Sequence, residues 1–183
     1  MNIFYLHEDV KQCAKMHVDK HVVKMIIEYA QLLSTAHRML DGTEYTGLSK
    51  NGRKVKRYSF DSDYKENTYY KAVHYHHPSA VWARESRLNY RWLYNLFVAL
   101  CDEYTHRYGK RHATDTKLRV ALAKVPTNIS DKPFTQPTPA MSQFPQCIVK
   151  NDSLTSYRNY YKEAKSGFAV WTKRDVPDWY KVA

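Results

Sequence analysis

The segment Met16–Arg38, MHVDKHVVKMIIEYAQLLSTAHR, predicts a long helix with one unusual polar face. At about 100° per residue, five polar side chains fall within roughly 80° of one another. They are His17, His21, Lys24, Glu28 and Gln31. Most of the remaining circumference is apolar, as expected for a helix at the centre of a small protein. The pattern therefore predicts a central helix whose polar face lines a cleft.

The residue types on this face indicate chemistry. A solvated helix face usually carries Lys and Glu pairs four residues apart, and such a face is the alternative interpretation. Here two histidines accompany one lysine and one glutamate, which together donate and accept protons near neutral pH. His17 and His21 also have the i, i+4 spacing of metal ligands, but the adjacent Glu of a HExxH motif is missing. We therefore expect a catalytic face with no metal and no other cofactor.

The chain is strongly basic. Among its 183 residues, Lys and Arg outnumber Asp and Glu by 29 to 18, which gives a formal net charge of +11. This excess favours a polyanionic partner, with nucleic acid first. No apolar run approaches the roughly 20 residues of a membrane span, and the start of the chain lacks a signal-peptide pattern. We expect a soluble, intracellular protein with no membrane partner.

The segmentation of the chain predicts one all-α domain over residues 1–183, with two long helices and several shorter ones. Asn2–Leu6 is expected to be a short extended arm, and residues 43–60 a basic hairpin or loop. The second long helix is expected to open at Pro78 and end near Gly109. Residues 125–150, with five prolines, are expected to be irregular, and shorter helices are expected at 64–73, 117–124 and 151–168.

Several basic and aromatic residues are candidates for nucleic-acid contact. The basic segment supplies four cations, unless it is only a solvated loop: Arg53, Lys54, Lys56 and Arg57. His77 precedes the free first turn of a helix, where amide donors favour anions. Arginines follow it at helical spacing, at Arg84, Arg87 and Arg91. The alternative for Arg84 is a structural salt bridge.

The order of these parts resembles the pyrimidine dimer DNA glycosylase family, the small helical repair enzymes of endonuclease V type. The shared layout covers most of the chain: a short N-terminal arm, an Ala14-x-x-His17 helix start, a histidine-containing approach to a long aromatic helix, and a C-terminal Pro-x-Trp-Tyr-Lys over residues 177–181. The chain also resembles small proteins encoded by tailed phages. That second resemblance implies the cytoplasm of an infected bacterium.

The family resemblance implies a nucleophile and its supporting groups. In that family the protein's α-amine attacks the deoxyribose C1′, releases the base through an imine and permits β-elimination of the strand. An α-amine, with an ordinary pKa of about 7.7 to 8.0, is partly unprotonated at neutral pH. Carried over here, the amine belongs to Met1 and the acid is Glu28 or Asp19. The family's paired Arg-Glu is not reproduced, and Asp19-Lys20 is its nearest counterpart.

The remaining roles follow from the same resemblance. Phosphates and the opened sugar would be held by Lys20, Lys24, His17 and Arg84. A base that leaves the stack needs an aromatic wedge or platform, for which the candidates are Trp82, Trp179 and Tyr180, with Lys181 beside them.

The sequence thus predicts a monomeric DNA glycosylase with AP-lyase activity on damaged or modified bases in double-stranded DNA. Two alternatives remain open. One is a non-catalytic DNA- or RNA-binding protein that uses the same basic surface. The other is a phage enzyme that modifies a nucleic-acid base.

Overall fold

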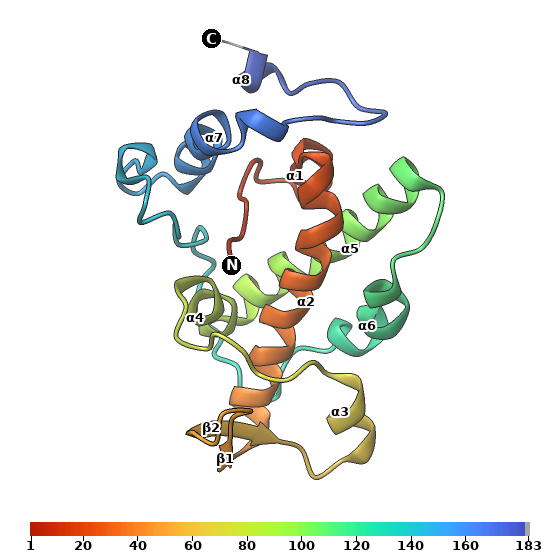
Figure 1. Cartoon of the computed structure of the whole chain (residues 1–183), viewed down its shortest axis with the longest axis vertical. Helices are drawn as coiled ribbons and strands as arrows, with labels where there is room; N and C mark the ends of the chain where they lie inside the picture. The colour runs from red at the N-terminus through yellow and green to blue at the C-terminus, as the bar shows by residue number, and fades with distance from the viewer. Residues whose placement is uncertain (182–183) are drawn as a thin grey trace.

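The structure, a computed structural model, describes residues 1–181 and is mostly helical. Two long helices, α2 (Asp19–Asp41) and α5 (Arg87–Tyr108), pack against each other at its centre (Figure 1). Helices α1, α4 and α6 pack around this pair. The other elements in chain order are α1 (Val10–Met16), β1 (Thr43–Leu48), β2 (Lys54–Ser59), α3 (Asp63–Thr68), α4 (Pro78–Glu85), α6 (Ala113–Ala123), η1 (Pro145–Cys147), α7 (Ser153–Ala164), η2 (Ser166–Phe168) and α8 (Asp178–Lys181).

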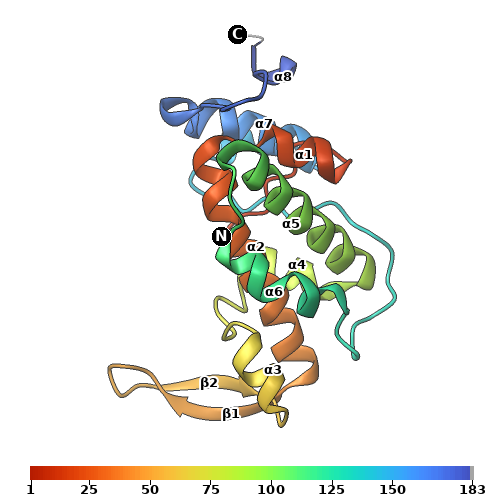
Figure 2. The same ribbon diagram turned by 90° about the vertical axis from the view of Figure 1, so that its right-hand side faces the viewer.

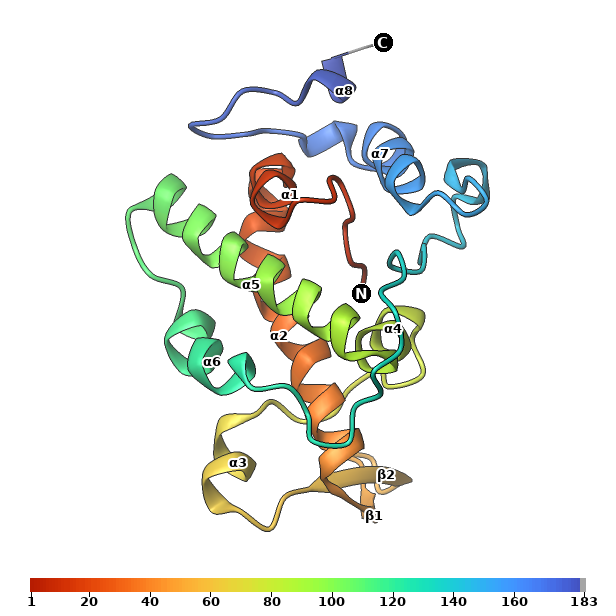
Figure 3. The same ribbon diagram turned by 180° about the vertical axis from the view of Figure 1, so that it is seen from behind.

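The predicted N-terminal arm is extended, and it is part of the core. Residues 3–6 are at most 3% exposed, although they belong to no helix or strand. The arm runs between α2 and α7, as Figure 3 shows from behind. Arg158 of α7 donates two hydrogen bonds to the carbonyl oxygen of Leu6, at 3.1 and 2.9 Å. The backbone N–H of Phe4 donates to the Tyr29 hydroxyl of α2 at 3.2 Å. The arm is therefore fixed from both sides.

The predicted first long helix does not begin at Met16. There α1 ends, and His17 and Val18 are extended, with ψ angles of 134° and 155°. The His17 ring nitrogen Nδ1 lies 2.8 Å from the carbonyl oxygen of Cys13, to which it donates. This bond satisfies a carbonyl at the end of α1 and turns the ring inward. His17 therefore does not share the polar face of α2, and that part of the prediction is wrong.

The second predicted long helix is two helices. Ser86 interrupts it with an extended backbone, φ −147° and ψ 154°. The Ser86 hydroxyl accepts from the backbone N–H of Asn89 at 3.1 Å, which caps α5. The Asn89 side chain donates to the carbonyl oxygen of Trp82, so α4 and α5 remain joined across the break. Gly109, with φ 68°, ends α5 as predicted.

Residues 43–60 form a hairpin, so the fold is mostly helical with one small sheet. Strands β1 and β2 pair antiparallel from Thr43 opposite Ser59 to Leu48 opposite Lys54. Arg38, whose side chain is fully buried, donates to the carbonyl oxygens of Tyr58, Tyr69 and Tyr70 and fixes the base of the hairpin. The rest of the hairpin projects outward (Figure 2).

The proline-containing segment 125–150 is irregular apart from η1, as predicted. It is held against the helices by side-chain bonds such as that from the Trp82 indole N–H to the carbonyl oxygen of Thr135, at 3.0 Å. The predicted short helices are present with shifted ends, as α3, α6 and α7. Within residues 1–181, no helix combines the length and the apolar character needed to cross a bilayer.

Candidate active site

The polar face of α2 contributes to a pocket of about 230 Å³ at the end of the N-terminal arm. Three elements form it: the arm, α2 and the α7–η2 region. Four residues predicted from the sequence meet there, namely Met1, His21, Lys24 and Glu28. Tyr160 and Lys165 also line the pocket. Neither of these two residues was predicted, because no local sequence pattern indicates that α7 packs beside α2.

His21 is held as a neutral ring. It stacks on Phe4 with ring centroids 4.2 Å apart, and its Nδ1 lies 2.7 Å from the Tyr161 hydroxyl. Burial, reinforced by the positive charges of nearby groups, lowers the pKa of His21 to about 2. The Tyr161 side chain is fully buried and its hydroxyl already accepts from the backbone of Val18, so its own proton needs an acceptor, and Nδ1 of His21 provides one. The proton of the neutral His21 ring is therefore on Nε2.

Lys24 and Glu28 form an ion pair one helical turn apart, at 3.2 Å. The Lys24 side chain is 70% exposed, whereas that of Glu28 is 15% exposed. A second cation, Lys165, lies over the ring of Tyr160 at 4.6 Å from its centroid. The pocket thus combines one shielded carboxylate with two lysines, a charge distribution that suits an anionic ligand.

His77 approaches this pocket from α4. Burial lowers its pKa, and the positive charge of the N-terminal amine lowers it further, while Glu28 acts in the opposite direction. His77 is therefore close to both the Met1 amine and the carboxylate. Its Nδ1 accepts from the backbone N–H of Ser79 at 3.2 Å and caps α4. A neutral His77 ring consequently keeps its proton on Nε2.

Two residues predicted as catalytic are structural instead. His17 is fully buried, and both of its ring nitrogens are used: Nδ1 donates to Cys13, and Nε2 accepts from the Tyr29 hydroxyl at 2.9 Å. Burial lowers its pKa to about 4, so the ring is neutral. Asp19 does not line the pocket. It accepts from Arg107 at 2.7 Å and from the Thr172 hydroxyl at 2.6 Å, which fixes the C-terminal segment.

Trp82 cannot act as the predicted wedge. Its side chain is only 2% exposed, and its indole N–H is bonded to Thr135. Arg87 is paired with Asp131 at 2.7 Å, and Lys20 lies over the ring of Phe168. Arg91 is exposed. Arg87 and Lys20 thus each have a contact within the chain, and their predicted contact with nucleic acid stays a prediction.

The remaining candidates for nucleic-acid contact fall into two groups. The hairpin group includes Arg53, Lys54, Lys56 and Arg57, of which Lys56 is paired with Glu44 at 3.0 Å. The other group is Trp179, Tyr180 and Lys181 in α8, at the opposite end of the long axis (Figure 1). The Trp179 indole N–H is directed to the sulfur of Met16 at 3.3 Å, so this ring packs against α1. The two groups do not form one patch.

Arg84 belongs with the hairpin group. It is half-buried in the last turn of α4, and Tyr58 of β2 is close enough to affect its pKa, which burial lowers. Its Nη1 is buried and has no hydrogen-bond partner among residues 1–181. The structural salt bridge considered for Arg84 is not formed with any described residue. In Figure 2, the hairpin tip and the N-terminus face the same side of the molecule.

Comparisons with protein-family models, with curated proteins and with solved structures gave no match. In the part of the chain that the structure describes, no three His, Cys, Asp or Glu side chains are grouped so that they could hold a metal ion. The chemistry available at the pocket is therefore that of the described side chains and the Met1 amine: a carboxylate, two lysines, two neutral histidines and one α-amine.

Proposed function

We propose that this protein is a DNA glycosylase with associated AP-lyase activity, and that the Met1 α-amine is its nucleophile. The observation that supports this most strongly is the position of Met1 in a pocket shared with Glu28 and Lys24. An amine nucleophile needs a fixed approach to its target carbon and a neighbouring group that accepts protons. The buried arm supplies the first requirement and Glu28 the second.

The proposed reaction proceeds through an imine. The amine attacks C1′ of the deoxyribose, the bond from C1′ to the base breaks, and the base leaves with the bonding electrons and takes up a proton. Loss of a proton from the nitrogen and opening of the sugar give the imine. Removal of a proton from C2′ then expels the 3′ phosphate, and water releases the product from the amine. Glu28 accepts the protons, while Lys24 and Lys165 hold the phosphates.

The hairpin supports double-stranded DNA as the substrate. The tip of the hairpin lies on the side of the molecule where the N-terminus lies (Figure 2). Phosphate contacts of this kind orient a duplex without reading its sequence. Arg84, with an unpaired buried nitrogen beside the hairpin, offers a further donor. We infer that the hairpin and Arg84 hold the backbone while the target nucleotide enters the N-terminal pocket.

Borohydride trapping tests the proposal. The protein, with Met1 verified as its first residue by mass spectrometry, is incubated with duplexes that carry an abasic site or a modified base, and the imine is then reduced. We expect a covalent adduct on the peptide that contains Met1, and its loss when the amine is acetylated. Glu28→Gln should slow strand cleavage by about 100-fold or more, as general acid–base catalysis contributes 10²–10⁴-fold. Glu85→Gln, on the exposed surface of α4, is the matched control.

Three outcomes would overturn the assignment. An adduct on Lys24 or Lys165 would give the role of nucleophile to a lysine of the pocket. Full activity after acetylation would remove the α-amine from the mechanism. Salt-dependent DNA binding with neither base release nor strand cleavage on any substrate would leave a binding protein.

A further inference from the structure

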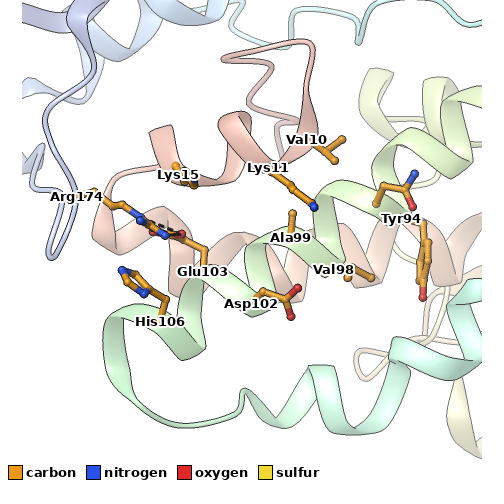
Figure 4. A pocket seen from close by; sticks show the side chains of 11 residues that line it. Val10, Lys11, Lys15, Tyr94, Val98, Ala99, Asp102, Glu103, His106 and Arg174 are labelled. Carbon is orange, nitrogen blue, oxygen red and sulfur yellow. Dashed lines mark hydrogen bonds and ion pairs between the residues drawn. The ribbon is translucent and has the colours of Figure 1, made fainter.

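A separate groove lies between α1 and α5, with a volume of about 510 Å³ (Figure 4). Pockets of this size are typical of small-molecule sites. Its floor is aliphatic, formed by Val10 of α1 with Val98 and Ala99 of α5. In Figure 2, α1 lies on the side of the molecule opposite the hairpin tip and the N-terminus. The groove is thus distinct from the N-terminal pocket.

Both acidic groups of the groove are in ion pairs with arginines. Asp102 accepts from Arg119 at 2.6 Å. Glu103 accepts from Arg107 at 2.7 Å and from Arg174 at 2.9 Å, and the bond between Glu103 and Arg174 closes one end of the groove (Figure 4). Glu103 is thus held in a buried network with two arginines, whereas Asp102, whose side chain is 65% exposed, is held by one surface ion pair.

The two lysines of the groove are uncommitted. Lys11 and Lys15 lie one turn apart on α1, and neither ammonium group has an ion-pair partner among residues 1–181. Side chains four residues apart on a helix are neighbours. Figure 4 shows Lys11 extending from α1 over the groove toward α5. Two lysines that line a groove with aliphatic residues favour a ligand with an anionic head and an apolar body.

We propose that this groove binds a nucleoside monophosphate. The phosphate would lie between Lys11 and Lys15, because the compact charge of a lysine ammonium group on its flexible side chain suits a phosphate. The base would cover Val98 and Ala99. The exposed amide of Asn95, which also lines the groove, has a donor and an acceptor that match the edge of a base. This site is independent of the proposed glycosylase activity, because it shares no residue with the N-terminal pocket.

Isothermal titration calorimetry with the full chain tests the site. The probes are deoxyadenosine monophosphate, deoxyadenosine and inorganic phosphate. We expect the nucleotide to bind at least about 10-fold more tightly than either fragment, because the groove holds both parts of the ligand at once. Lys15→Ala should weaken the nucleotide by about 5- to 10-fold, as expected for the loss of one partly exposed charged contact.

Two further variants distinguish a built site from general attraction to a basic protein. Lys132→Ala removes an exposed charge from the irregular segment and should leave nucleotide affinity unchanged. Ala99→Leu keeps the net charge but fills the floor, and it should abolish binding. Equal affinity for nucleotide and phosphate, equal losses for Lys15→Ala and Lys132→Ala, or undiminished binding by Ala99→Leu would each overturn the proposal.

Discussion

Replacing Tyr29 by phenylalanine should destabilise the protein and release the N-terminal arm. The Tyr29 hydroxyl accepts from the Phe4 N–H at 3.2 Å and donates to Nε2 of His17 at 2.9 Å. All three residues are at most 3% exposed, so Tyr29→Phe leaves one buried donor and one buried acceptor without partners. Each unsatisfied group costs about 1 to 3 kcal/mol. Because the bond from Phe4 is long, we expect a total loss of about 3 kcal/mol in the free energy of unfolding.

Urea denaturation measures this loss, and hydrogen exchange locates it. A loss of about 3 kcal/mol corresponds to a fall in Tm of about 6 to 12 °C for a chain of this size. The Phe4 amide should exchange at least about 100-fold faster in the variant, because its acceptor is gone. Tyr94→Phe is the control, since its hydroxyl donates to the carbonyl oxygen of Arg119 in a half-buried position. A loss below about 1 kcal/mol with Phe4 still protected would refute the reasoning.

Three other predictions follow from the buried charges and the hairpin. Burial lowers the pKa of His17 and His37 to about 4 in the folded protein. In the unfolded chain both histidines have the ordinary pKa of about 6.5, so between these two pH values they bind protons only when the chain is unfolded. The free energy of unfolding should therefore be highest above pH 6.5 and fall by about 2 kcal/mol per histidine by pH 5. Urea denaturation that gives the same free energy of unfolding at pH 7.5 and pH 5 would contradict this. Arg107→Met removes the buried partner of Glu103 and should lower the free energy of unfolding by about 3 to 5 kcal/mol in urea denaturation. Arg111→Met, at a largely exposed arginine, should lower it by less than about 1 kcal/mol. Similar losses for the two variants would refute the importance of burial. Neutralising Arg53, Lys54 and Arg57 of the hairpin should reduce the slope of log K against log salt concentration for duplex binding by about 2 to 3. An unchanged slope would show that the DNA binds elsewhere.

The parts of the fold that depend on local signals were predicted well. The extended arm, the basic hairpin, the end of α5 at Gly109 and the irregular proline segment were all expected from residues that act over one or two turns. The two helix breaks were missed for a physical reason. At Ser86 and His17, a side chain replaces a helical hydrogen bond with one of its own, and the apolar periodicity on either side continues unchanged.

The site was predicted where its residues share one element. His21, Lys24 and Glu28 lie on one face of α2, and a helical wheel is enough to group them. Lys165 was missed because its approach depends on the packing of a distant helix. His17 was wrongly assigned because the sequence alone does not distinguish a histidine that is hydrogen-bonded inside the core from a histidine in an active site. Only the contacts of its ring with Cys13 and Tyr29 distinguish the two.

The docking of the arm against α7 also constrains how the protein is made. Residues 3–6 leave the ribosome long before Arg158, whose guanidinium binds the carbonyl oxygen of Leu6. At translation rates of about 5 to 20 residues per second, this delay is on the order of 10 s. During that time the apolar residues 3–6 cannot dock against α7 and stay accessible to chaperones or to non-native contacts. The N-terminal pocket, which Tyr160 of α7 also lines, is then completed late in synthesis, when α7 has been made.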